Sequence, residues 1–305
     1  MAIGAEAVQI FSSNPRIWQP RSVEAEEMTA LVAGLRKHRL PLFFHTIYLI
    51  NLASPDESLR LRSVRSLSHA LVSGALAGAA GVVTHVGSHK GEGFEAALDL
   101  VADAVRAAGE AARGSLAAQG HQPVLPPLLL ETGAGAGTIV GGRLEELAAL
   151  LAALRPGAGS PGRKSSQADP PGADPPGAGP LDIGLCLDTA HMFAAGYAVH
   201  EAAGLEVLID ELRRRELLRK VGLIHLNDST APFASNQDRH ANPGEGQIGY
   251  EGLARVVTHP ALARIPFVLE VPGSEGHGPD AANVALVKSM RAGAPSPPGA
   301  PAPGG

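Results

Sequence analysis

Short apolar segments alternate with longer amphipathic segments along most of the chain. The short segments are rich in Val, Ile, Leu and Phe and lack alternating polar positions, which is typical of strands buried on both faces. The segments between them repeat apolar residues at helical spacing. The predicted strands cover about 5–11, 42–45, 81–85, 128–131, 183–187, 221–228 and 266–270. The predicted helices cover about 23–38, 55–79, 93–118, 143–154, 202–219, 250–257 and 280–291.

This alternation of strand and helix predicts a parallel α/β sheet. Polar residues stand at the carboxyl ends of most predicted strands. An open doubly wound sheet would collect its site at one switch point, whereas a barrel uses the ends of strands all round. The pattern therefore favours a TIM (β/α)8-type barrel, as a single domain over residues 1–292. Only seven strands are predicted, so the barrel is expected to lack its first β/α unit.

Two segments break the alternation. Residues 156–180 and 293–305 are rich in Pro, Gly, Ala and Ser. Such compositions bury too little apolar surface to offset the entropy of ordering. We expect a disordered surface insertion and a disordered tail.

Composition narrows the possible functions. The net charge of −5 provides no general basic field for nucleic acid, so such a ligand would need a local site. The single cysteine, Cys186, excludes an internal disulfide and fits a reducing compartment. No apolar run approaches the roughly 20 residues of a membrane span. We expect a cytoplasmic protein with no membrane partner.

A set of imidazoles and carboxylates at the strand ends, or in the loops that follow them, forms the candidate site. Nitrogen and oxygen ligands without thiolate suit catalytic zinc, with manganese and iron as rivals. The set exceeds the four ligands of one tetrahedral ion, which predicts three ions sharing a bridging carboxylate. Sites with several metal ions are typical of phosphoester hydrolysis. The candidate ligands are His45, His85, Glu131, Asp188, His191, His225, Asp238, His240 and Glu270.

Single members of this set have simpler explanations. Asp188 could equally cap the following helix, and a lone strand-end histidine such as His45 is more often structural. Glu131 and Glu270 are stronger candidates, because an unpaired buried carboxylate costs roughly 1–3 kcal/mol or more. His89 comes four residues after His85 and could face the site, but at most behind the metal ligands. The remaining histidines are expected at the surface: His38, His69, His121, His200, His259 and His277.

Eight motifs run in order along nearly the whole chain, from about residue 4 to 291 apart from residues 156–180. They are QIFSSNPRIW, HTIYLINLASP, THVGSH, LETGAGAGTIVG, CLDTAHMFAAGY, HLNDS, DRHANPGEGQIG and LEVPG. Together they resemble the endonuclease IV family of apurinic/apyrimidinic (AP) endonucleases. The family begins with a strand, a Gly-rich turn and a helix that have no counterpart here. Adding such a unit is expected to raise the melting temperature.

The resemblance implies three zinc ions, with Mn²⁺ possible at one site, and catalytic roles for Glu131, Glu270 and His191. It assigns His45, His85 and Glu131 to the first ion. Glu131, Asp188, His225 and Glu270 would hold the second, and His191, Asp238 and His240 the third. The implied reaction is hydrolysis of the DNA backbone on the 5′ side of an abasic site, leaving a 3′-hydroxyl, in base excision repair.

The implied partner is double-stranded DNA, bound by a monomer. Arg16, Tyr48 and Leu49 match positions that the family inserts into the duplex, and a cation beside an apolar wedge can hold a kinked duplex open. Without the family match, loop packing would better explain Tyr48 and Leu49. Two other functions stay open: a metal-dependent sugar isomerase or epimerase on the same barrel, and an inactive, truncated product.

Overall fold

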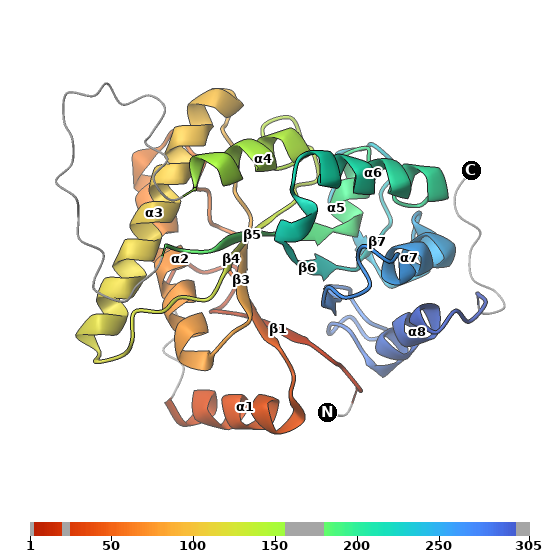
Figure 1. Ribbon diagram of the computed structural model, residues 1–305, viewed down its shortest axis with the longest axis horizontal. Coiled ribbons are helices and arrows are strands. Elements are labelled where there is room, and N and C mark those ends of the chain that lie inside the picture. Colours follow the sequence, from red (N-terminus) through yellow and green to blue (C-terminus); the bar gives the residue numbers. More distant parts are fainter. Residues whose placement is uncertain (1–2, 20–24, 156–179, 297–305) are drawn as a thin grey trace. The chain divides into compact units, whose positions relative to one another are not determined.

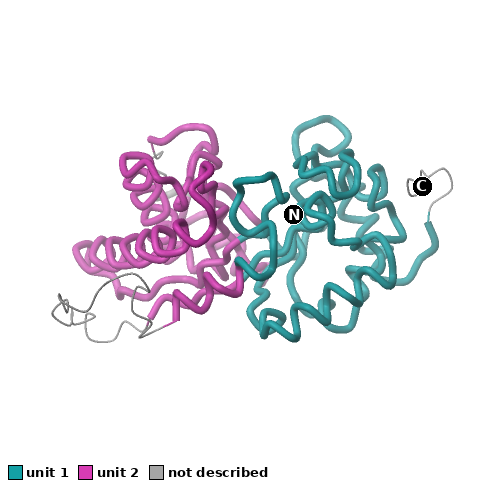
Figure 2. Tube along the Cα trace, turned by 90° about the horizontal axis from the view of Figure 1, so that it is seen from above, with its two compact units in different colours: residues 1–8, 131–146, 185–305 teal, residues 9–130, 147–184 magenta. Residues whose placement is uncertain are grey.

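The computed structural model describes residues 3–19, 25–155 and 180–296. They fall into two compact units, shown in teal and magenta in Figure 2. Unit 1 comprises residues 1–8, 131–146 and 185–305, and unit 2 comprises 9–130 and 147–184. Residues 156–179 of the predicted insertion and most of the predicted tail lie outside the described residues.

Unit 2 contains the first strands and the helices that follow them. In the hydrogen-bonded order β1-β2-β3-β4, strand β2 pairs in parallel with β3, and β3 with β4. Helices α2 and α3 pack against each other (Figure 1). The strands are β1 (Val8–Phe11), β2 (Leu42–His45), β3 (Gly81–Thr84) and β4 (Leu128–Glu131). The helices are α1 (Ala25–His38), α2 (Glu57–Ala77) and α3 (Phe94–Ala118).

Unit 1 continues the same alternation. Strand β6 pairs in parallel with β5 on one side and with β9 on the other. The strands are β5 (Ile183–Asp188), β6 (Val221–His225) and β9 (Phe267–Val268). The helices are α5 (Thr189–Ala194), α6 (Ala202–Arg214), η1 (Leu218–Lys220), α7 (Gly249–Thr258) and α8 (Ala281–Arg291). Strands β1, β4 and β5 and helix α4 (Leu144–Ala153) each run from one unit into the other.

The central strands are buried on both faces, as their apolar sequences predict. Every residue of β2, β3, β4 and β5 is buried. Parallel strands covered on both faces need such continuous apolar runs. A polar side chain at the end of one of these strands therefore projects from the rim of an apolar sheet.

Differences from the sequence expectations lie mainly in unit 1. The short helix α5 was not predicted, and strand β9 ends two residues before Glu270. The loop after β6 contains a two-stranded antiparallel ribbon of β7 (Asp228–Ser229) and β8 (His240–Ala241). Segments this short have no hydrophobic period, so no pattern could reveal them. No helix in the described part of the chain is long and apolar enough to span a membrane.

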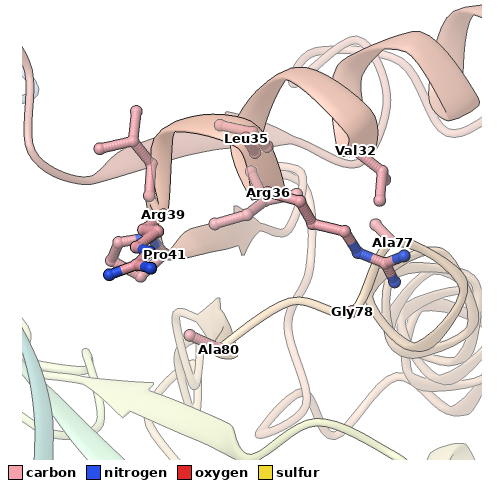
Figure 3. Close-up of a pocket in the computed structure, with 10 residues that line it drawn as sticks. Val32, Leu35, Arg36, Arg39, Pro41, Ala77, Gly78 and Ala80 are labelled. Carbon is pink, nitrogen blue, oxygen red and sulfur yellow. The ribbon is translucent and has the colours of Figure 1, made fainter.

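A cavity of about 330 Å³ lies in unit 2 between α1 and α2 (Figure 3). Its wall includes Arg36, Arg39, Pro41 and Ala80, which precede strands β2 and β3. His45 lies at the opposite, carboxyl end of β2. The cavity is therefore separate from the end of β2 that carries His45.

The N-terminal residues of unit 1 are tied to α8 by ion pairs. Arg291 Nη1 lies 2.6 Å from Glu6 Oε2, and Lys288 Nζ lies 3.2 Å from Glu6 Oε1. The hydrogen bond from Arg291 is the main reason that the pKa of Glu6 is lowered from 4.5 to about 2.

This pair predicts a pH-dependent contribution to stability. A lowered carboxyl pKa stabilises the fold above the unfolded-state pKa of 4.5, and that stability is lost as the pH falls towards about 2. Because the pair is solvent-exposed, Glu6→Gln should lower the free energy of unfolding by only about 0.5–1 kcal/mol near neutral pH. Urea unfolding of both proteins across this window should show the difference shrinking as the pH falls. A difference that is unchanged at low pH would contradict the assignment.

Candidate metal centre

Three strand ends and one loop of unit 1 bring the first group of candidate ligands together. Glu131, Asp188 and His225 are the last residues of β4, β5 and β6, and Glu270 follows β9. Each of the four offers a ligand atom, and these atoms all lie within 4.8 Å of one another. His225 Nδ1 is 3.0 Å from Glu131 Oε1 and 3.0 Å from Glu270 Oε2. We call these four residues the carboxylate group.

A second group shares Asp188 with the first. Asp188, His191 and His240 also offer ligand atoms within 4.8 Å of one another. Asp238 joins them: its Oδ2 lies 3.2 Å from His191 Nε2, and its Oδ1 lies 3.1 Å from His240 Nε2. We call these four residues the imidazole group. Asp188 is fully buried and lies in both groups, so it can serve as a bridging carboxylate.

Hydrogen bonds to the backbone orient the imidazole rings. His191 Nδ1 donates to the Thr132 carbonyl at 2.8 Å, and His240 Nδ1 donates to the Glu270 carbonyl at 2.9 Å. A carbonyl can only accept, so Nδ1 carries a proton and Nε2 is the nitrogen that can ligate once it is deprotonated. His240 Nε2 is buried and makes no hydrogen bond of good geometry, although Asp238 is near. An electron-pair donor left in this way fits a metal ligand.

The carboxylates that surround the imidazoles shift their pKa values. Burial would lower the pKa of His191, but Asp188, Asp238 and Glu131 outweigh it and raise that pKa well above its usual range. Burial would likewise lower the pKa of His240, but Asp188 and Asp238 raise it to about 9. The site thus attracts positive charge strongly, and protons compete with a metal ion for it.

Further buried side chains hold the carboxylates in place. Asp188 Oδ1 accepts from the His191 backbone N–H and caps α5, so it is both a helix cap and a candidate ligand. Asn227, which is fully buried, donates from Nδ2 to Asp188 Oδ2 at 2.7 Å. Its Oδ1 accepts from the Glu270 backbone N–H at 2.8 Å. Asn227 therefore sets the spacing between two members of the carboxylate group.

Asn227→Ala should weaken metal binding or activity by roughly 10–100-fold, as losing a partner of metal ligands commonly does. The measurements are metal content after dialysis and the cleavage rate. Asn283→Ala is the matched control, because Asn283 is also buried but serves the capping box of α8. Equal losses of metal in the two variants would show general loosening instead of a role in spacing.

Unit 2 carries the remaining candidates. His45 and His85 lie with ring centroids 5.3 Å apart, and His45 Nδ1 donates to the Thr46 carbonyl at 2.7 Å, which orients the ring as in the other two imidazoles. Tyr48 is 53% exposed, and its ring packs 5.2 Å from that of Phe11.

A backbone hydrogen bond joins the loop that carries Arg16 to the loop that carries Tyr48 and Leu49. The backbone N–H of Tyr48 donates to the Pro15 carbonyl at 2.9 Å, beside exposed Arg16. Leu49 is half-buried. The Tyr48 ring therefore packs on Phe11 while about half of the residue faces solvent, which fits both loop packing and an apolar wedge.

Two histidines that were expected at the surface are partly buried, and one residue that contacts the candidate ligands was not expected. His69 Nε2 is buried, and this burial lowers the pKa of His69. The His200 ring packs against the rings of Phe193 and Phe233. These two histidines are therefore not simple surface residues. His89 Nδ1 accepts from the backbone N–H groups of its own loop. Asn227 was missed because its role depends on strands far apart in the sequence. The available signals were its place two residues after the β6 ligand His225 and its position inside the HLNDS motif.

Comparison with known proteins identifies the fold and the family. The model of the family described as "Xylose isomerase-like TIM barrel" matches residues 1–160 and 178–292. A protein named "Probable endonuclease 4" from Halothermothrix orenii is 35% identical over 291 residues, which is 95% of this chain and 91% of the relative. Its namesake from Chloroflexus aurantiacus is 35% identical over 295 residues, or 96% and 92%.

Comparison with solved structures supports the same fold and family. Endonuclease IV from Thermus thermophilus superposes with a TM-score of 0.72 at 36% identity, covering 96% of this chain and 91% of that one. A D-tagatose 3-epimerase-like protein reaches a TM-score of 0.60 at 14% identity, which shows the fold alone. The chain is a TIM-barrel, DNA-cleaving hydrolase and belongs to the endonuclease IV family.

Proposed function

We propose that this protein is a zinc-dependent endonuclease that hydrolyses DNA 5′ to abasic sites and leaves a 3′-hydroxyl, in base excision repair. The observation that carries the proposal is the pair of ligand groups that share Asp188. Four carboxylates and three imidazoles within one unit are an oxygen and nitrogen donor set, which suits zinc or manganese.

The carboxylate and imidazole groups would each hold one ion, and His45 and His85 would contribute to a third. Mn²⁺ at one position is compatible with the same donors. Ions held there would neutralise charge on a phosphodiester and lower the pKa of water. Glu131, Glu270 and His191 are the residues that we expect nearest to the reacting phosphate.

The protein's own residues would orient the substrate. Arg16, with an exposed side chain, suits a phosphate or base edge, and Tyr48 and Leu49 offer an apolar wedge. Such wedges unstack bases and kink a duplex. An abasic site lacks one stacking partner, so it costs less to open than intact DNA. We expect the protein to act as a cytoplasmic monomer.

A nicking assay tests the proposal. Supercoiled plasmid with abasic sites should be converted to the open circle, while intact plasmid should not. The ends should support extension by a polymerase, because a 3′-hydroxyl is left. Tyr48→Ala should lose discrimination between the two plasmids, with Phe233→Ala as an exposed aromatic control. Absence of cleavage by zinc-loaded protein, or isomerisation of a sugar substrate instead, would overturn it.

A further inference from the structure

We propose that Asp228 is a positioning residue that shapes the loop carrying His240 and so completes the imidazole group; this deepens the proposed function and rests on it. Asp228 is fully buried and directly follows Asn227. It belongs to neither ligand group among the described residues. A buried carboxylate that binds no metal must be satisfied in another way.

Within the described ranges of the chain, Asp228 accepts hydrogen bonds from backbone N–H groups alone. Its Oδ1 accepts from Ser229 at 2.8 Å and Ile248 at 2.9 Å. Its Oδ2 accepts from Gly244 and Gly246, both at 3.0 Å. The N–H of Gly249, at the start of α7, lies within reach of both oxygens. The chain from 244 to 249 therefore wraps around one carboxylate.

The wrapped segment is continuous with the candidate ligand His240. In the β7–β8 ribbon, Asp228 is paired with Ala241, and Ser229 with His240. The Gln247 N–H donates to the Ser229 carbonyl at 2.7 Å, which closes the loop on the same two residues. Residues 240–249, which we call the clasp, are thus anchored at both ends on Asp228 and Ser229.

The clasp in turn contacts the chain after β9. His240 Nδ1 donates to the Glu270 carbonyl, and the Gly273 N–H donates to Asn242 Oδ1 at 2.8 Å. The position of His240 Nε2 therefore depends on the clasp. The carboxylate group depends on strand ends and on Asn227.

Residue types at two positions fit this role. An asparagine at 228 would keep the shape but would present N–H groups to backbone N–H donors. A Cβ at Gly246 would lie 2.5 Å from Asp228 Oδ1 and 2.4 Å from the Ser229 carbonyl oxygen. Asp228→Asn and Gly246→Ala therefore disturb the same contact by different means.

The experiment compares these two variants with matched controls. Glu146→Gln alters another buried carboxylate, which accepts from the Gly141 N–H. Gly137→Ala adds a methyl group where nothing lies within 4 Å. Full-length proteins are dialysed against buffers of fixed free zinc, bound zinc is measured by atomic absorption, and folding is followed by circular dichroism.

Both Asp228→Asn and Gly246→Ala should lose one zinc ion per chain selectively, with its affinity weakened roughly 10–100-fold. Cleavage should recover when free zinc is raised by the same factor, with KM for abasic DNA unchanged. The controls should keep the wild-type zinc content. Equal weakening of all ions, or wild-type zinc binding by folded Gly246→Ala, would overturn the role of Asp228. Wild-type protein that binds no zinc would instead overturn the proposed function.

Discussion

Asp188→Asn should reduce cleavage at abasic sites by about a thousandfold or more. Asp188 contributes a ligand atom to both groups, so one substitution weakens two ion positions. Metal ions supply several kcal/mol of charge stabilisation in such reactions, and each 1.4 kcal/mol corresponds to about tenfold in rate. Rates on an oligonucleotide with one abasic site, measured at saturating DNA, give the loss directly.

The fold should survive this substitution. Asparagine can still accept from the His191 N–H and cap α5. Its amide would face the Asn227 amide, so some stability is lost, on the order of 1–3 kcal/mol.

Asp280→Asn is the matched control for Asp188→Asn. Asp280 caps α8 and contacts Ser274, outside the ligand groups. If Asp188→Asn and the control had comparable activity, Asp188 would not be part of the metal site.

Removing metal with a chelator should abolish cleavage and lower the melting temperature. Zinc at 100 times its Kd stabilises the native state by about 2.7 kcal/mol per ion. Without ions, the carboxylates are balanced only by imidazoles that must take up protons, as the raised pKa values of His191 and His240 indicate. Zinc affinity should therefore fall as the pH drops below about 9, where His240 becomes protonated.

Scanning calorimetry and cleavage assays, before and after adding zinc back, test this expectation. Asp188→Asn protein is a useful comparison, because its melting temperature should respond less to chelation. Mg²⁺ added to the chelated protein should restore little activity, since Mg²⁺ prefers oxygen ligands and the imidazole group is rich in nitrogen. Full activity of chelated protein would contradict a metal-dependent mechanism.

The order of strands and helices could be predicted from the sequence because each buried strand carries its own apolar run. The ligand types were also visible, since Glu131, Asp188 and His225 end such runs. The exact ends of elements were less accessible: α5 follows Asp188 with no polar gap, and β9 is only two residues long. Neither segment is long enough to show a period.

The sequence by itself determined the parallel α/β architecture, the candidate ligands and, through its motifs, the family. These features depend on local hydrophobic pattern and on residue type at strand ends. Only the tertiary structure decided that Asp188 lies in two groups, that Asn227 spaces Asp188 from Glu270, and that Asp228 is wrapped by the clasp. Each of these contacts joins segments far apart along the chain, so folding alone brings their hydrogen-bonding groups within reach.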